Sequence, residues 1–156
     1  MIRDLIESDR NQTIELVNQF FRKVNELELD GLFRIRPRAA TKFTDIYFKL
    51  IGTGKVYMRG YFVEEELVSL VIGRIEEKPH LEEERSLFID LAVTKLGKKK
   101  KGYMTELLQD VDLWCLEKNI PAIELRAILK NEEAINFWNK SSFEPFYIRY
   151  RKRLVN

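Results

Sequence analysis

The sequence predicts an α/β protein in which a mixed (α+β) sheet of about six to seven strands is flanked by about four helices. Three observations lead to this fold class. Residues 9–27 and 43–50 carry apolar side chains at three- and four-residue steps, which is the period of a helix. Residues 55–75 alternate with period two, as a β-hairpin does. A strand–helix–strand pattern over 87–127 predicts a right-handed parallel crossover.

The amino-terminal elements follow from local signals. Met1–Ile6 alternates weakly and predicts a short strand. The first helix begins at about Asp9, where Asp9 or Asn11 is available as the capping residue. The second helix, over 43–50, is closed by two glycines that follow it.

The same kinds of local signal predict the strands and helices from residue 55 onward. The hairpin strands are Lys55–Val63 and Leu67–Ile75, separated by three glutamates, and Leu87–Val93 is a short buried strand. Four further elements complete the chain: a helix over Tyr103–Lys118, a strand over Ile120–Leu129, a helix over Glu132–Lys140 and a terminal strand or pair over Phe143–Leu154. No linker or repeat interrupts them, so residues 1–156 are expected to form a single domain.

Composition excludes several classes of protein. The 27 basic and 25 acidic residues nearly cancel, so bulk charge gives no reason to expect a nucleic-acid partner. With one cysteine, Cys115, and one histidine, His80, the chain has no internal disulfide, no cysteine-built zinc site and no multi-histidine metal site. No run approaches the roughly 20 apolar residues of a membrane span, and the amino terminus lacks a signal-peptide pattern. We therefore expect a cytoplasmic protein.

Residues 94–109, TKLGKKKKGYMTELLQ, place four consecutive lysines between a strand and a helix. The first N–H groups of a helix have no partner within it, and they attract anions such as phosphate. Gly102 lets a ligand approach the backbone closely. Together with Lys95, the lysines predict a phosphate-binding loop, although a solvated basic turn explains the charge alone equally well.

Two blocks carry a resemblance to a known family. LFIDLAVTKLGKKKKGYMTELLQ and IPAIELRAILKNEEAINFWNKSSF resemble the GNAT superfamily of acyl-CoA-dependent N-acyltransferases. The family has an Arg/Gln-x-x-Gly-x-Gly/Ala loop between strand and helix, and an Asn-x-x-Ala-x-x-Phe-Tyr-x-Lys-x-Gly-Phe segment downstream. The resemblance covers 87–143 well, and it implies a GNAT-like fold with acetyl-CoA as cofactor.

The resemblance assigns acetyl-CoA binding to three stretches. They are the strand residues Leu91, Ala92 and Val93; the loop and helix residues Lys98, Lys99, Lys100, Lys101, Gly102, Tyr103, Met104 and Thr105; and the downstream residues Asn131, Ala134, Phe137 and Lys140. Met104 stands where the family has a small residue, Trp138 where it often has tyrosine, and Ser142 where it has glycine.

The resemblance also implies direct attack of an amine on the acetyl thioester, with a backbone N–H on the strand stabilising the oxyanion. For the base we select Asp90, an acidic residue inside an apolar strand; a structural ion pair is the alternative reading. Glu124 is a second candidate with the same alternative. Trp138 occupies the position of the family's acid, but an indole N–H is no practical proton source.

Two clues to the acceptor conflict. Eight acidic residues between Glu64 and Glu84 favour a cationic amine, either a small molecule or a protein amine, whereas FRIRPR (33–38) favours an anionic group. The expected function is N-acetyl transfer from acetyl-CoA to a primary amine. The alternatives are a catalytically reduced acyl-CoA-binding or regulatory module and, least favoured, a nucleic-acid-binding domain using RYRKR (149–153). A homodimer is compatible with the sequence.

Overall fold

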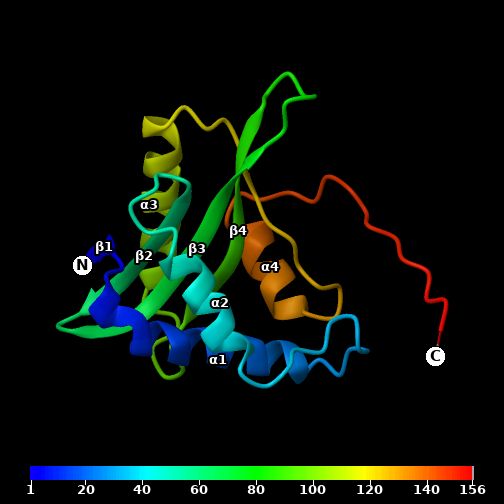
Figure 1. Ribbon diagram of the computed structural model, residues 1–156, viewed down its shortest axis with the longest axis horizontal. Coiled ribbons are helices and arrows are strands. Elements are labelled where there is room, and N and C mark those ends of the chain that lie inside the picture. Colours follow the sequence, from blue (N-terminus) through cyan, green and yellow to red (C-terminus); the bar gives the residue numbers. More distant parts are fainter. Residues whose placement is uncertain (156) are drawn as a thin grey trace. The chain divides into compact units, whose positions relative to one another are not determined.

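A computed structural model of the chain describes residues 1–155, and Figure 1 shows the order of its helices and strands. The described residues form two compact units, Met1–Arg126 and a second that begins at Ala127. The single domain expected for residues 1–156 stays a prediction. The first unit contains β1 (Ile2–Asp4), the 3-10 helix η1 (Glu7–Asp9), α1 (Arg10–Asn25), α2 (Ala39–Phe48), β2 (Val56–Val63), β3 (Glu66–Glu77), β4 (Arg85–Thr94), α3 (Tyr103–Glu117) and β5 (Ile123–Glu124). The second unit contains α4 (Glu132–Lys140).

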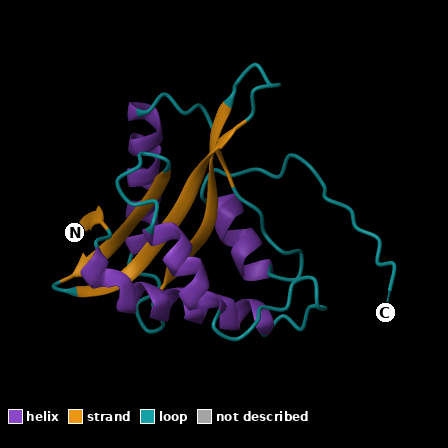
Figure 2. Ribbon diagram, viewed as in Figure 1, coloured by secondary structure: helices purple, strands orange, loops and turns teal. Residues whose placement is uncertain are grey.

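The strands of the first unit form one sheet in the order β1-β2-β3-β4-β5, drawn as arrows in Figure 2. The first four strands pair antiparallel, and β4 pairs with β5 in parallel. Because α3 connects these two strands, the predicted parallel pairing across a helix is confirmed. The β2–β3 turn is Glu64-Glu65, since Val63 pairs with Glu66, which already belongs to β3.

Helices cover both faces of this sheet. Helices α1 and α2 lie over one face, where Val17 and Ile72 belong to the same buried apolar cluster. Helix α3 packs on the opposite face, where the ring of Tyr57 meets the ring of Trp114 edge-on at a centroid distance of 5.5 Å. The sheet is therefore the shared middle layer of an α+β fold.

At one point of the β3–β4 pairing, β4 carries one extra residue. Leu91 of β4 pairs with Ile72 of β3. The next pair joins Ile89 to Gly73, which leaves Asp90 between them as a β-bulge residue. The buried side chains of β4 consequently change face: Leu91 joins the cluster under α1 and α2, whereas Ile89 lies with Gly73 on the α3 face. Bulges of this kind redirect side chains and are common beside active sites.

The sheet has fewer strands than predicted, five within residues 1–155 against about six to seven. The predicted strand Ile120–Leu129 shortens to β5, which follows Pro121, a residue without a backbone N–H. The predicted terminal strand or pair Phe143–Leu154 contains no strand. A strand requires the main chain of a neighbour, and among the described residues this segment pairs with none, leaving Ile148 and Tyr150 74% and 86% exposed.

Asp9 fastens the amino-terminal strand to the start of α1. Arg3 donates hydrogen bonds of 2.7 and 3.0 Å to its carboxylate, and the backbone N–H of Ile6 donates a third of 2.9 Å. The side chain of Asp9 does not cap α1, in contrast to the role that the sequence suggested. Its hydrogen bonds to Arg3 hold the pKa of the Asp9 carboxyl below its ordinary value.

We predict that Gly73→Ala destabilises the protein, because a Cβ at this position would lie 2.9 Å from the backbone oxygen of Phe88. Backbone opposite a bulge cannot move aside cheaply, so the free energy of unfolding should fall by about 1–3 kcal/mol. Gly31→Ala is the control, since nothing lies within 4 Å of its added Cβ. Urea unfolding compares them, and equal midpoints for the two variants would contradict the assignment of the bulge.

We also predict that Asp9→Asn lowers the free energy of unfolding at pH 7 by about 1–3 kcal/mol, the range for hydrogen bonds to charged groups. A carboxyl whose pKa is depressed by folding contributes its stability above its unfolded pKa, ordinarily 3.8, and loses it as pH falls through the folded value. The gap between wild type and variant should therefore close in acid. A gap that stays constant from pH 7 to pH 2 in urea titrations would refute the Arg3 contact; exposed Asp112→Asn is the control.

Candidate active site

The lysine-rich loop connects the end of β4 to the start of α3. Gly102 is the residue before the helix and has φ 85°, a left-handed conformation that glycine adopts without strain. The N–H of Glu106 donates to the carbonyl of Gly102 at 3.0 Å, which starts the helical hydrogen bonding. The N–H groups of Tyr103, Met104 and Thr105 precede it at the positive end of the helix dipole. The predicted loop and helix residues are thus contiguous, with glycine where a ligand needs close approach.

The lysines of this loop do not act as one block of charge. Lys95 and Lys98 bind the carboxylate of Glu66 with N–O distances of 2.8 and 3.4 Å. The hydrogen bond to Glu66 raises the pKa of Lys95, and the same bond lowers the pKa of Glu66. Lys99–Lys101 are exposed. Sequence reasoning missed Glu66, which lies at the start of β3 and reduces the net charge of the loop.

One edge of β4 is open next to the bulge. In the parallel pairing with β5, Leu87 pairs with Ile123 and Phe88 pairs with Glu124, which is the last residue of β5. Among the described strands, none therefore runs beside residues 89–94 on this edge. Such an edge presents backbone N–H and C=O groups that can pair with an extended ligand containing amides.

The predicted strand residues contribute to this edge through their backbone. The side chains of Leu91 and Val93 are buried, with the residues 1% and 7% exposed, so they support the sheet. Ala92 is half-buried and small. Side chains of this kind leave the main chain accessible to a ligand along the edge.

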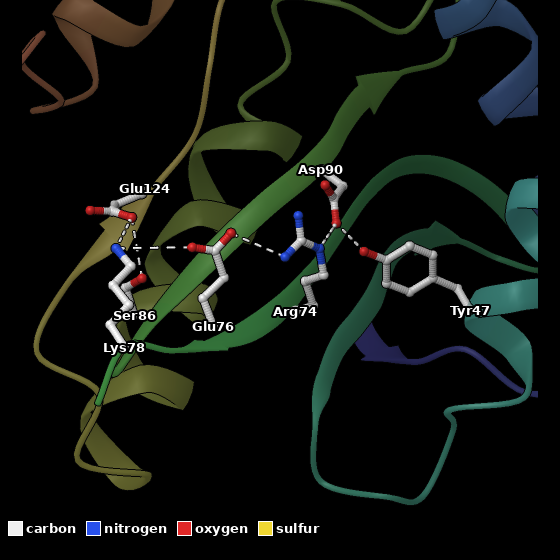
Figure 3. Close-up of polar contacts among 7 residues, drawn as sticks. All are labelled: Tyr47, Arg74, Glu76, Lys78, Ser86, Asp90 and Glu124. Atoms are coloured by element: carbon white, nitrogen blue, oxygen red, sulfur yellow. Dashed lines mark hydrogen bonds and ion pairs between the residues drawn. The ribbon is translucent and has the colours of Figure 1, made fainter. Parts of the chain in front are cut away.

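Asp90 connects Tyr47 of α2 to Arg74 of β3 near one end of a polar cluster (Figure 3). Its Oδ2 accepts a hydrogen bond from the hydroxyl of Tyr47 and one of 3.1 Å from Nε of Arg74. Its Oδ1 has no protein partner within residues 1–155. Burial, followed by the hydrogen bond to Asp90, raises the pKa of Tyr47, so the phenol stays a donor. Asp90 thus forms the structural ion pair that was its alternative interpretation. Its second carboxylate oxygen, Oδ1, takes no part in that ion pair.

The cluster continues along the sheet toward β5 (Figure 3). Arg74 also binds Glu76 at 3.0 Å, and Lys78 lies 3.9 Å from Glu76 and 2.5 Å from Glu124. Ser86 donates to Glu124 at 3.2 Å. Glu124 is thus engaged in a structural ion pair, which was the alternative reading of this residue.

Two open pockets lie on the first unit, one beside the Lys78–Glu124 ion pair and one beside the lysine-rich loop. One, of about 410 Å³, is bordered by Lys78, Ser86 and Glu124. The other, of about 400 Å³, lies between α1 and the start of the lysine loop, bordered by Glu15 and Lys95 among others. Both combine charged side chains with apolar ones, Leu81 in the first and Leu16 and Leu67 in the second.

The downstream set of predicted residues lies together in the second unit, on α4. Asn131 caps this helix, its side chain accepting from the N–H of Ala134 at 3.2 Å. The ring of Trp138 packs edge-on against Phe137 and Phe143, with centroids 5.0 and 5.2 Å away. Lys140, in the last turn, is exposed. Within the described residues, Asn131 thus caps the start of α4, and Trp138 packs against Phe143 just beyond its end.

Neither a membrane-spanning helix nor a cluster of metal ligands occurs in the described part of the chain. No helix of residues 1–155 has both the length and the apolar character needed to cross a bilayer. Within the same residues, no three His, Cys, Asp or Glu side chains are grouped so that they could hold a metal ion. Burial raises the pKa of the Cys115 thiol to about 11, which keeps it protonated.

The sequence matches no family model, and no curated protein matches it. Solved structures match the whole fold. A mutant of the BH1408 protein from Bacillus halodurans aligns over 99% of both chains, with 16% identity and a TM-score of 0.83. The aminoglycoside 6'-N-acetyltransferase AAC(6')-Ig from Acinetobacter haemolyticus aligns over 100% of this chain and 99% of its own, with 12% identity and a TM-score of 0.75.

A predicted acetyltransferase from Clostridium acetobutylicum, solved with acetyl-CoA, aligns over 99% of this chain and 96% of its own, with 13% identity and a TM-score of 0.75. The resemblance to the GNAT superfamily is therefore confirmed at the level of the fold: across its whole length the chain has the α+β fold of GNAT acetyltransferases.

Proposed function

We propose that the protein is an N-acetyltransferase that moves an acetyl group from acetyl-CoA to a primary amine by direct attack on the thioester. The observation that carries the proposal is the open β4 edge at residues 89–94, which leads directly into the lysine loop and the start of α3. The edge suits the amides of an extended pantetheine arm, and the loop suits a pyrophosphate. The β4 edge and the lysine loop together therefore suit acetyl-CoA.

Strand β4 and the lysine-rich loop are proposed to bind different parts of acetyl-CoA. The backbone groups of Leu91, Ala92 and Val93 that face the open edge are proposed to bind the donor, and a backbone N–H there is proposed to stabilise the oxyanion. The exposed ammonium groups of Lys99–Lys101 and the first N–H groups of α3 favour the phosphates. In the second unit, α4, with Asn131, Ala134, Phe137 and Lys140, is proposed to contribute as the family resemblance implies.

Asp90 is proposed to receive the proton of the amine. When bound, acetyl-CoA supplies the thioester carbon; the N–C bond forms, the C–S bond breaks, and the amine proton passes to Oδ1 of Asp90. Tyr47 and Arg74 both hold Oδ2, which fixes the carboxylate and leaves Oδ1 to accept the proton. The bulge places this side chain on the face covered by α2, within reach of Tyr47.

Trp138 is proposed to contribute a hydrogen bond at most, because an indole cannot serve as a proton source near neutral pH. The thiolate of CoA is a sufficiently good leaving group to depart without an acid. The packing of Trp138 between two phenylalanine rings supports the alternative function, an acyl-CoA-binding or regulatory module with reduced catalysis. Release of CoA thiol in the presence of a panel of amines distinguishes the two functions.

We predict that Lys99→Glu/Lys100→Glu weakens acetyl-CoA binding at least tenfold, because two charge reversals oppose the phosphates at the proposed cradle. The matched control is Lys49→Glu/Lys55→Glu, which makes the same charge change at two exposed lysines of the α2–β2 connection. Isothermal titration calorimetry measures both. Equal affinity in the two variants would locate the donor elsewhere.

We predict that Asp90→Asn lowers kcat about a hundredfold or more while the affinity for acetyl-CoA stays unchanged, because the amide cannot accept the proton. Tyr47→Phe should produce a smaller loss of kcat, since it frees the carboxylate without removing it. The control is Asp45→Asn, another α2-region carboxylate paired with an arginine. A wild-type rate for Asp90→Asn would exclude Asp90 as the base.

A further inference from the structure

The connection between α1 and α2, residues 26–38, exposes three arginines at alternate positions, Arg34, Arg36 and Arg38. The guanidinium of Arg34 reaches a backbone carbonyl, that of Leu29, at 3.4 Å. Within residues 1–155, neither Arg36 nor Arg38 has a carboxylate partner. Ion pairs engage Arg3, Arg10, Arg59 and Arg74 of the first unit. The connection thus presents three exposed guanidinium groups at alternate positions.

The backbone of the connection is held in place. The side chain of Asn25 accepts from the N–H of Ile35 at 2.8 Å and donates to its carbonyl at 3.1 Å. Asp30 accepts from the N–H of Leu32 at 3.1 Å, and Pro37 fixes its own φ. A segment held in this way loses little conformational entropy when it binds a ligand.

Arg38 has φ 65°, in the left-handed region that favours glycine. Arg38 is the residue immediately before α2, and its side chain makes no capping hydrogen bond to that helix. An arginine kept in an unfavourable backbone conformation points to a function for its guanidinium.

The arginines and the proposed base lie at opposite ends of α2. Tyr47, which holds Asp90, follows Arg38 by nine residues, or about 13 Å of helix at 1.5 Å per residue. The ring of Phe43 lies between them and contacts the ring of Tyr47 at a centroid distance of 4.9 Å. An extended peptide covers about 13 Å in four residues. A ligand that binds both ends of α2 therefore needs an amine and an anionic group about four residues apart.

We propose that the acceptor is an acidic peptide whose terminal amine lies at Asp90 and whose carboxylates, about four residues further on, bind Arg34, Arg36 and Arg38. This inference rests on the proposed function and names its substrate class. A polycationic amine would be repelled by the three arginines. A bipolar peptide meets both charge patterns, and the bonds made and broken are those of the proposed reaction.

The test compares two hexapeptides with amidated carboxyl ends, Ser-Ala-Ala-Glu-Glu-Ala and Ser-Ala-Ala-Gln-Gln-Ala. Each is titrated by calorimetry into the full-length protein in the presence of CoA, and each is assayed for acetyl transfer with acetyl-CoA. The proteins are wild type, Arg36→Gln/Arg38→Gln and the charge-matched control Lys49→Gln/Lys55→Gln. The Glu peptide should bind wild type and the control at least tenfold more tightly than the Gln peptide, with a KM lower by the same factor.

Loss of this preference in Arg36→Gln/Arg38→Gln, with kcat retained, is the expected result. Arg38→Gly, which removes the backbone strain, should fold at least as stably as wild type and weaken binding of the Glu peptide as well. Equal binding of the two peptides by wild type, or a preference that survives in the arginine variant, would overturn the inference. Transfer to a polycationic amine without binding of either peptide would also overturn it and leave the proposed function intact. Selective binding of the Glu peptide without transfer to any amine would support the arginine surface and contradict the proposed function.

Discussion

The bulge at Asp90 is the constraint on which the rest of the proposed site depends. One extra residue in β4 moves Leu91 to the α1 and α2 face while Ile89 stays on the α3 face, so both layers receive apolar side chains from one strand. Gly73 accepts this arrangement because it has no Cβ to meet the opposite backbone. The bulge lies two residues after the last strand pair between β4 and β5. The same short stretch thus provides a polar side chain and an open main-chain edge.

Ion pairs and hydrogen bonds orient the charged groups around the proposed site. Glu66 binds Lys95 and Lys98, which leaves the following lysines to define the positive end of the loop. Tyr47 and Arg74 converge on one oxygen of Asp90 and thereby fix the orientation of its carboxylate. Surface ion pairs contribute little stability by themselves. Their importance here is geometric, because they fix the orientation of the groups that a ligand would meet.

Much of this fold could be predicted from local patterns, and its long-range contacts could not. The helix Glu132–Lys140 and the crossover through α3 were predicted correctly, because period and capping signals are local. The strand predicted over 143–154 was wrong, since alternation shows that a segment can pair but supplies no partner. Asp90 could be singled out from sequence, but its partners are separated from it by 16 residues for Arg74 and 43 for Tyr47. No spacing rule joins residues so far apart, and the bulge itself appears only when two strands are placed in register.

The central claim is that the open edge of β4 and the start of α3 together receive acetyl-CoA, and backbone amide hydrogen exchange tests it most directly. With acetyl-CoA added to the full-length protein, exchange should slow at residues 89–94 and at the first turn of α3, Tyr103–Thr105, while the distant β1 and β2 stay unchanged. Unchanged exchange at both places, or slowing confined to the pocket beside Glu15 on α1, would contradict the account.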